Sequence, residues 1–424
     1  MGRRHLFYSI NIILIIIIMS FSSVWAEDIE KESLDLFIEQ ALGNSPKIQA
    51  AYNNWKAAEY NIKQVSGLPD PVLHYTYFGE NIQTRVGPQE RKYGISQKIP
   101  FPGKLNLKRK AESEYAKMRK EEYESLKREV IKNIKFIYYD IFWVDKIIQI
   151  TKEEKIILEN LEQVIKAKYE SNLTPQQDVI KVQVELSRLI EKLFILEQNR
   201  KSLAAKMNSV LNRAVDTEIE KITSIEEPED LKYELSKLRE IAKESQQDLL
   251  VASLDIERAK YKKSLARLNY TPDLTVGFDY IQIGSGSTTM SNDGQDAWTG
   301  TVSINVPLWF DKSNADLRSK NAALKASRNN YKDIENKIIY EIEDVYFKIM
   351  SYKSIISLYK TALIPQTEQA FEVAEIGYET GTVDFLNLLD SERILLQTKL
   401  AYYKGIVDYQ KSISYLERII GKDL

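Results

Sequence analysis

Histidine and cysteine, two residue types that often carry chemistry, are nearly absent from this sequence of 424 residues. Cysteine does not occur, which excludes disulfides, thiolate metal sites and cysteine nucleophiles. The histidines are His5 and His74. His74 and Glu80 form an incomplete ligand set, because protein zinc sites use three or four side chains. We therefore predict no metal site, and we interpret His74 as an interior-facing or interfacial strand residue.

Motifs that bind phosphate or place a catalytic nucleophile are also missing. The sequence has no Walker motif, no GxGxxG fingerprint and no GxSxG elbow, and Gly284-Ser285-Gly286 is typical of a loop. A basic cluster formed by Lys104, Lys108, Arg109 and Lys110 is interpreted as a solvated or headgroup-level patch. The formal net charge of −2 gives no basic footprint for nucleic acid. We predict no catalytic residues and no cofactor, so the chain is not expected to be an enzyme.

The first residues, MGRRHLFYSINIILIIIIMSFSSVWA, have the pattern of a secretory signal peptide. Two arginines precede an apolar run, and a small-x-small motif ends at Ala26. We predict a signal peptide over residues 1–26 with cleavage between Ala26 and Glu27. The alternative is a retained anchor, although the apolar run is shorter than the ~20 residues that span a bilayer as a helix. Without cysteine, lipid modification of an N-terminal cysteine is excluded.

Three short segments recur in the same order at nearly one offset. Tyr169-Glu-Ser-Asn is echoed by Tyr378-Glu-Thr-Gly, Ile99-Pro100 by Val306-Pro307, and Pro69-Asp70 by Pro272-Asp273. Such self-similarity indicates an internal duplication. We predict repeat 1 over residues 27–213, an acidic linker over 214–231 and repeat 2 over 232–424.

Each predicted repeat contains a helix, a pair of strands and a long helical hairpin. The opening helices are expected at about Ser33 to Val65 and Tyr233 to Leu268, each ended by a proline. Alternation at period two predicts strand pairs at about 71–101 and 273–308, joined by polar loops at Glu80 to Glu90 and Gly284 to Asp296.

The hairpins are expected at about 104–213 and 311–420. Residues 104–174 and 311–364 contain no glycine or proline, and a helix over the first of these would be ~100 Å long. Leucines at steps of four and three indicate antiparallel coiled coils, and only Arg200 interrupts the first returning helix.

Four strands cannot close a membrane barrel by themselves, because an open edge in hydrocarbon leaves backbone groups unpaired. A homotrimer would contribute twelve strands, an even number within the range of outer-membrane barrels. The alternative is a small β-subdomain packed on helices. The sequence patterns leave both open.

These features resemble the TolC-type outer-membrane efflux proteins, the outer-membrane factors of tripartite efflux and type I secretion systems. The resemblance rests on the duplication, the Tyr378-x-x-Gly381 element, Pro365 thirteen residues before that tyrosine, and the strand ending Ser96-Gln-Lys-Ile-Pro-Phe-Pro-Gly-Lys104. That last segment is most similar to the heavy-metal cation efflux branch.

The resemblance implies a mainly α fold with a membrane β-barrel: a trimeric twelve-stranded barrel in the outer membrane of a Gram-negative bacterium, continued by a long α-helical barrel in the periplasm. It implies contacts with outer-membrane lipid, a periplasmic adaptor protein and an inner-membrane pump of the resistance-nodulation-division class. The implied function is passive export of heavy-metal cations or small toxic compounds. Alternatives are a type I secretion channel and, from another class, a periplasmic coiled-coil adaptor.

The resemblance also implies functional residues at the periplasmic entrance. Asp390 and Asn387 stand at the family's acidic-ring positions, twelve and nine residues after the tip tyrosine, and Asp384 could supplement them. A carboxylate ring in a narrow pore favours cations. The alternative for Asp390 is a solvated surface carboxylate. Adaptor contacts, or simple turns, are expected at the hairpin tips, which are formed by Asn172, Leu173, Thr174 and Pro175 and by Gly381, Thr382 and Val383.

Overall fold

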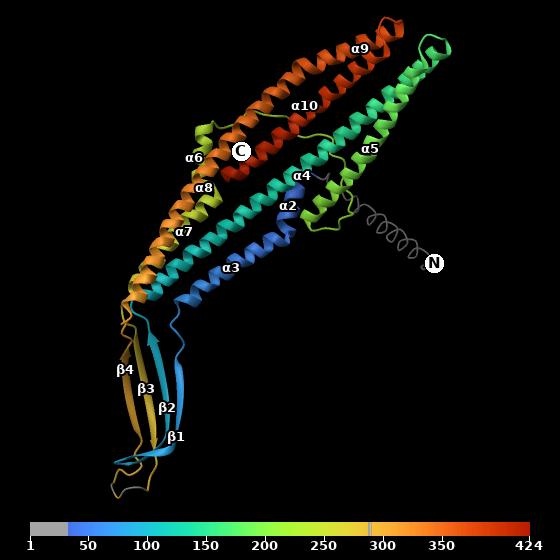
Figure 1. Ribbon diagram of the computed structural model, residues 1–424. Coiled ribbons are helices and arrows are strands. Elements are labelled where there is room, and N and C mark those ends of the chain that lie inside the picture. Colours follow the sequence, from blue (N-terminus) through green and yellow to red (C-terminus); the bar gives the residue numbers. More distant parts are fainter. Residues whose placement is uncertain (1–32, 287–288, 290) are drawn as a thin grey trace, which may run out of the picture.

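The computed structural model is an elongated molecule in which a small sheet continues into long helices (Figure 1). The structure describes residues 33–286, 289 and 291–424. The predicted signal peptide and its cleavage point between Ala26 and Glu27 lie outside the described residues. Both long hairpins point away from the sheet, and their tips lie at the same end of the molecule.

Helices make up most of the described chain. No helix in these residues is both long and apolar enough to cross a membrane. The helices are α2 (Leu34–Asn44), α3 (Pro46–Ser66), α4 (Lys104–Glu170), α5 (Gln176–Leu211), α6 (Leu235–Ser245), α7 (Gln247–Leu268), α8 (Phe310–Leu358), α9 (Ile364–Thr380) and α10 (Phe385–Ile420).

The two opening helices predicted from sequence are each divided in two. Ser45, in an extended conformation before Pro46, separates α2 from α3, because the residue before a proline is disfavoured in the helical region. Gln246 separates α6 from α7 and is also extended. Its side chain accepts a hydrogen bond of 2.7 Å from the backbone N–H of Leu249, which caps α7.

The sheet is antiparallel and has the strand order β1-β2-β3-β4. Its strands are β1 (Val72–Thr84), β2 (Gly87–Ile99), β3 (Leu274–Ile283) and β4 (Ala297–Ile304). The polar loop predicted at Glu80 to Glu90 is wrong, because both strands run through most of it and only residues 85–86 turn. The pairing register shifts between Tyr77 and Ile82 and breaks the alternation of apolar and polar side chains. The sequence pattern therefore does not indicate a strand in this segment.

The fourth strand is shorter than expected. It ends at Ile304, so Val306 and Leu308 lie beyond the sheet, although they continue its apolar alternation. Asn305 ends the pairing: its backbone N–H bonds to the carbonyl of Asp273 at 3.3 Å, and its side chain accepts from the Asp273 N–H. The chain then enters α8 at Phe310.

The descending helix of the second hairpin is interrupted by one wide turn, a π-helical segment at Tyr359–Leu363. Pro365 follows it at the start of α9. Proline has no N–H to bond four residues back, and its ring clashes with that carbonyl. A widened turn accommodates the proline without ending the rod.

Three hydrophobic clusters hold the helices together. The first joins α2, α3, α4, α5, α10 and residues 219–222, and the second joins α6, α7, α8 and α10. The third lies near the tips and joins α4, α5, α9 and α10, so it connects the two hairpins. Its buried members are Leu158, Ile165, Val182, Leu189, Ala374, Tyr378, Phe385, Leu388 and Leu389.

Candidate functional site

The two faces of the sheet differ in polarity. On one face the side chains are large, apolar and exposed, with ring pairs Tyr75–Tyr93 at 5.3 Å and Phe278–Trp298 at 6.0 Å between centroids. The opposite face carries charged and small polar residues. A sheet that is apolar and exposed on one side requires an apolar environment there. The exposed apolar residues are Leu73, Tyr75, Tyr77, Tyr93, Ile95, Val276, Phe278, Tyr280, Trp298 and Val302.

His74 belongs to a row of residues that crosses the polar face. His74 pairs in register with Gly94, and Gly94 pairs with Asp279. The Nε2 atom of His74 donates to Oδ1 of Asp279 at 2.6 Å, and Lys92 Nζ lies 3.1 Å from Oδ2. Because Gly94 has no side chain, the two partners meet across β2: a Cβ at this position would lie 1.9 Å from His74 Nε2. His74 is therefore partnered by Asp279 and not by Glu80.

The base of the sheet is joined to the helices by one carboxylate. Asp273 accepts from Lys104 Nζ at 2.7 Å and from the backbone N–H of Phe101 at 3.0 Å. Lys98 pairs with its other oxygen at 3.1 Å. The interpretation of Lys104 as a solvated side chain is wrong, because it is 8% exposed and its charge is balanced by Asp273. Its predicted companions Lys108, Arg109 and Lys110 are exposed.

The two hairpin tips have the same backbone geometry. Asn172 (φ 55°) and Gly381 (φ 80°) are both left-handed. In each tip the next amide bonds to a carbonyl five residues back, at 2.8 Å for Leu173 and for Thr382. This is the Schellman ending of a helix, for which glycine or asparagine is suited. Thr174, Pro175 and Val383 complete the turns, and the Thr174 hydroxyl donates to Asp178 at 2.8 Å.

A contact between the hairpins lies directly above the tips. Lys168 Nζ donates to the backbone carbonyl of Tyr378 and, at 3.2 Å, to that of Glu379. It also lies 4.3 Å from the centroid of the Tyr378 ring. That ring is buried against Phe385, with 6.1 Å between centroids, and burial raises the pKa of the Tyr378 phenol. One lysine therefore fixes the end of α9 to the end of α4.

The three candidate pore residues occupy the first two turns of α10. Asp384 is the N-cap: it accepts from the Asn387 backbone at 2.9 Å and from the Asn387 side chain at 3.1 Å. Asp390 lies one turn further along and is exposed. Residues three apart share a helix face, so Asn387 and Asp390 point to the same side. Asp384 has a capping role, and among the described residues only Asp390 of the three makes no hydrogen bond or ion pair of its side chain.

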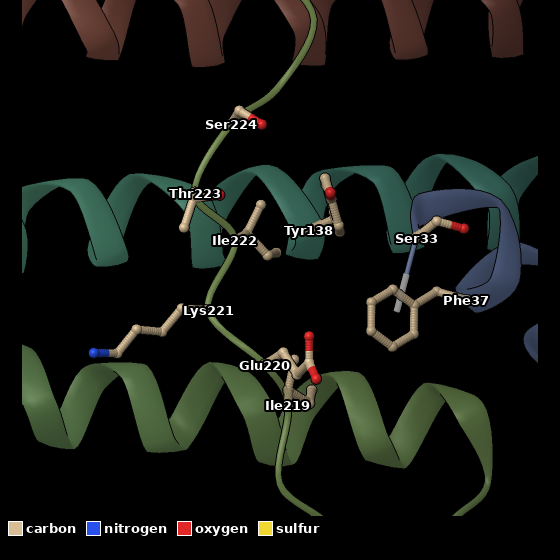
Figure 2. Close-up of a pocket in the computed structure, with 9 residues that line it drawn as sticks. All are labelled: Ser33, Phe37, Tyr138, Ile219, Glu220, Lys221, Ile222, Thr223 and Ser224. Carbon is tan, nitrogen blue, oxygen red and sulfur yellow. The ribbon is translucent and has the colours of Figure 1, made fainter. Parts of the chain in front are cut away.

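The acidic linker crosses the middle of the helices as a segment without regular secondary structure (Figure 2). Arg200 donates to the carbonyls of Ile219 and Glu220 at 2.7 and 3.0 Å, and it pairs with Asp145 at 3.0 Å. Asp145 in turn accepts from the backbone N–H of Ile222 at 3.1 Å. Arg200 interrupts the leucine stripe because it holds this segment. The linker, α2 and α4 enclose a shallow pocket lined by Ser33, Phe37, Tyr138 and residues 219–224.

Sequence reasoning missed the partners that lie far along the chain. Lys168 and Asp279 carry no local signal of their contacts. Glu154 and Glu392 do carry a local signal. Glu154 is four residues from the buried Leu158, and Glu392 is four residues from the buried Leu388, each on the same helix face as its leucine. A carboxylate in an apolar register predicts a buried charge. Both glutamates are buried.

Comparison with known proteins finds similar sequences. Residues 238–422 match the family model described as Outer membrane efflux protein. The cobalt-zinc-cadmium resistance protein CzcC of Cupriavidus metallidurans is 19% identical over 397 residues, covering 92% of this chain and 90% of that protein. The outer membrane protein TolC of Vibrio cholerae is 21% identical over 418 residues, covering 94% and 92%.

Solved structures share the fold. The outer membrane protein VceC of Vibrio cholerae has a TM-score of 0.76 at 18% identity, covering 92% of this chain and 96% of that one. CusC has a TM-score of 0.78 at 15% identity and covers 93% of each chain. Residues 238–422 therefore match the outer membrane efflux proteins, and the chain shares the fold of VceC and CusC. The matched relatives are outer membrane efflux and resistance proteins and not enzymes, in agreement with the expectation from the sequence.

Proposed function

We propose that this chain is one of three identical subunits of an exit duct that leads from the periplasm through the outer membrane. The observation that carries the proposal is the sheet, which is apolar on its exposed face and polar on the other. Its edges, β1 and β4, have no further strand partner within the described residues. Unpaired edge groups cost several kcal/mol each in hydrocarbon. Three sheets joined edge to edge would form a closed barrel of twelve strands around a polar lumen.

The helices support the same assembly. Exposed apolar residues run along α5, on one side of the molecule, and along α8, on the other (Figure 1). A subunit that presents different apolar surfaces on its two sides suits head-to-tail contacts that close into a ring. Such contacts would continue the barrel as a helical tunnel. The exposed residues include Ile180, Val184, Phe194 and Ile195 on α5, and Tyr340, Phe347, Met350 and Leu358 on α8.

In this proposal, residues 27–213 and 232–424 are two copies of one unit, and residues 214–231 link them at mid-height. The mature subunit begins at Glu27 after removal of the signal peptide. The exposed tips at 172–175 and 381–383 contact a periplasmic adaptor. The Schellman turns support that role, because they hold short exposed segments in a fixed shape.

Heavy-metal cations are the proposed cargo, delivered by an inner-membrane pump of the resistance-nodulation-division class. Two observations support this choice: the relation to a protein named for cobalt, zinc and cadmium resistance, and the unpaired, exposed carboxylate of Asp390 near the tips. Three copies of Asp390 around a narrow pore would stabilise a passing cation and repel anions. Asn387 contributes no charge at the neighbouring ring position.

The assembly is tested first by fractionation and cross-linking. The chain should be extracted from the outer membrane by detergent and should cross-link to trimers. A water-soluble monomer in the periplasmic fraction would contradict the duct and would favour a periplasmic adaptor.

The cargo is tested separately in a strain that lacks the gene. Loss of the chain should lower tolerance to cobalt, zinc or cadmium, and the wild-type chain should restore it. Copurification should recover the adaptor and the pump. Unchanged metal tolerance together with lost secretion of a protein would replace metal export by type I secretion, while the duct itself would stand.

A further inference from the structure

A buried polar layer separates two of the hydrophobic clusters along the hairpins. Towards the tips lies the cluster that contains Leu158 and Leu388, and towards the sheet lies the one that contains Ile141 and Val407. Between them α4 contributes Thr151 and Glu154, and α10 contributes Glu392. Thr151 is 0%, Glu154 8% and Glu392 6% exposed. Two carboxyl groups from different hairpins are thus buried at the junction of the hairpins.

These groups lack the partners that buried charges need. Glu154 Oε2 and Thr151 Oγ1 are inaccessible and have no hydrogen-bond partner among the described residues. No ion pair of Glu154 or Glu392 is found in the same part of the chain. A buried carboxylate without a partner is strongly unfavourable, and such a group is neutralised by binding a proton.

The other charged groups around the pair lie on α5, α10 and α9. Helix α5 brings Lys192 and Glu185, and Glu185 is paired with Arg188 at 2.8 Å. Helix α10 brings Arg393. On the far side of α10, helix α9 carries Glu368, which pairs with Lys399 at 2.9 Å, and the exposed Glu372 and Glu375.

The balance of these effects favours the protonated forms. Burial raises the pKa of Glu392 to about 8, and repulsion by Glu154 adds to it. Burial likewise raises the pKa of Glu154 to about 7, opposed in part by Lys192. Both carboxyls therefore change charge close to neutrality and not near their ordinary value.

We propose that Glu154 and Glu392 form a proton-binding pair that couples the packing of the two helix hairpins to the pH of their surroundings. The direction follows from linkage. The packed form binds more protons than a form in which the carboxyls are solvated, so packing is most stable below the ordinary pKa of about 4.5 and weakens as the pH rises to about 8. When both groups are ionised, burial and mutual repulsion act together to separate the hairpins.

The pair is placed where such a change would reach the tips. Beyond it, the two hairpins are joined by the cluster around Leu158 and by the contact of Lys168, on α4, with the end of α9. Loosening at Glu154 and Glu392 would leave these contacts as the connection between the hairpins on the tip side of the pair. The inference concerns the packing of one chain and does not depend on the nature of the cargo.

The test measures the distance between the hairpins. The chain has no cysteine, so spin labels can be placed only at the introduced residues Asn160→Cys on α4 and Gln397→Cys on α10, both exposed positions. The full-length protein in detergent, mixed with excess unlabelled chain, is measured at pH 5 and at pH 9. The fraction of molecules with separated hairpins should be at least about tenfold larger at pH 9 than at pH 5, since the pKa of each glutamate lies more than one unit above its ordinary value.

Glutamine variants provide the controls, because the amide imitates the protonated carboxyl in shape and charge. The doubly substituted Glu154→Gln, Glu392→Gln chain should stay packed at both pH values. Glu191→Gln, an exposed glutamate on α5, should respond to pH as the unsubstituted chain does. If the double variant does not fold, Glu392→Gln alone should show a smaller change. A distance independent of pH in the unsubstituted chain, or one that still changes in the double variant, would overturn the proposal.

Discussion

The ammonium group of Lys168 lies 4.3 Å from the centre of the Tyr378 ring and donates to the backbone carbonyl of the same tyrosine. Carbonyls in the last turn of a helix have no intrahelical donor and form the negative end of the helix dipole. The lysine on α4 thus satisfies the end of α9 and pairs with an aromatic face in the same contact. This contact links the two hairpins through residues that are 210 positions apart in the chain.

Replacing Lys168 by methionine should loosen the tip of the second hairpin without unfolding the protein. Methionine keeps the apolar stem and removes the donor, at an expected cost of about 1–2 kcal/mol. Hydrogen exchange of the amides at 376–383 should accelerate roughly tenfold. The matched control is Lys166→Met, since the ion pair of Lys166 within the described residues is with Glu162 on its own helix. Equal exchange in the two variants would show that Lys168 does not hold the tip.

Replacing Gly94 should disturb the polar face of the sheet. A Cβ there would lie 1.9 Å from His74 Nε2 and 2.2 Å from Asp279 Oδ1, so Gly94→Ala must displace the pair. We expect the thermal midpoint to fall by several degrees, because a partly buried polar pair loses its geometry. Gly300→Ala is the control, since a Cβ at Gly300 meets nothing within 4 Å. If both variants melted together, the pair across Gly94 would have no structural importance.

The sequence predicts the helices and the polarity of the sheet well, because both depend on local periodicity. The alternation of Leu274, Val276, Phe278 and Tyr280 reports one apolar face, and the structure has it. The division at Ser45 depends on a single proline, and the turn after Thr84 is hidden by a register shift. Neither feature changes the average composition of its segment, so a prediction that relies on that composition does not detect it.

The candidate site was predictable only where its geometry is local. Asn172 and Gly381 are left-handed, as the tip pattern and the tolerance of asparagine for this conformation indicated. The contacts of His74 with Asp279 and of Lys168 with Tyr378 join residues more than 200 positions apart. Such pairs depend on strand register and helix packing, and a single sequence carries no information on either.

Substitutions at Asp384 and Asp390 should have different effects, the first on the stability of the tip and the second on the ion selectivity of the channel. Asp384→Ala removes the N-cap of α10 and should destabilise the tip by about 1 kcal/mol, seen as faster hydrogen exchange at 384–390. Asp390→Asn removes no contact in the described chain, so its exchange should be unchanged. In single-channel recordings, however, Asp390→Asn should weaken the preference for cations. Unaltered selectivity would remove Asp390 from the proposed pore role.

Arg200→Leu tests whether the gap in the leucine stripe is a defect or a functional position. The substitution completes the coiled-coil pattern of α5, so pattern alone predicts higher stability. It also removes three hydrogen bonds of the guanidinium and leaves Asp145, whose side chain is 7% exposed, without its ion-pair partner. A buried carboxylate that loses its cation should cost about 3–5 kcal/mol.

The destabilisation caused by Arg200→Leu should appear first in the linker. Limited proteolysis should cut between residues 214 and 231 faster in Arg200→Leu, and the thermal midpoint should fall. Arg188→Leu is the matched control, because Arg188 pairs with Glu185 on the exposed face of the same helix. Such surface pairs contribute about 0–1 kcal/mol. If Arg200→Leu were instead more stable and equally resistant to protease, the continuous stripe would outweigh the bonds to Ile219 and Glu220. The other contacts of the linker, such as those of Asn208 with Val215 and Thr217, would then suffice to hold it.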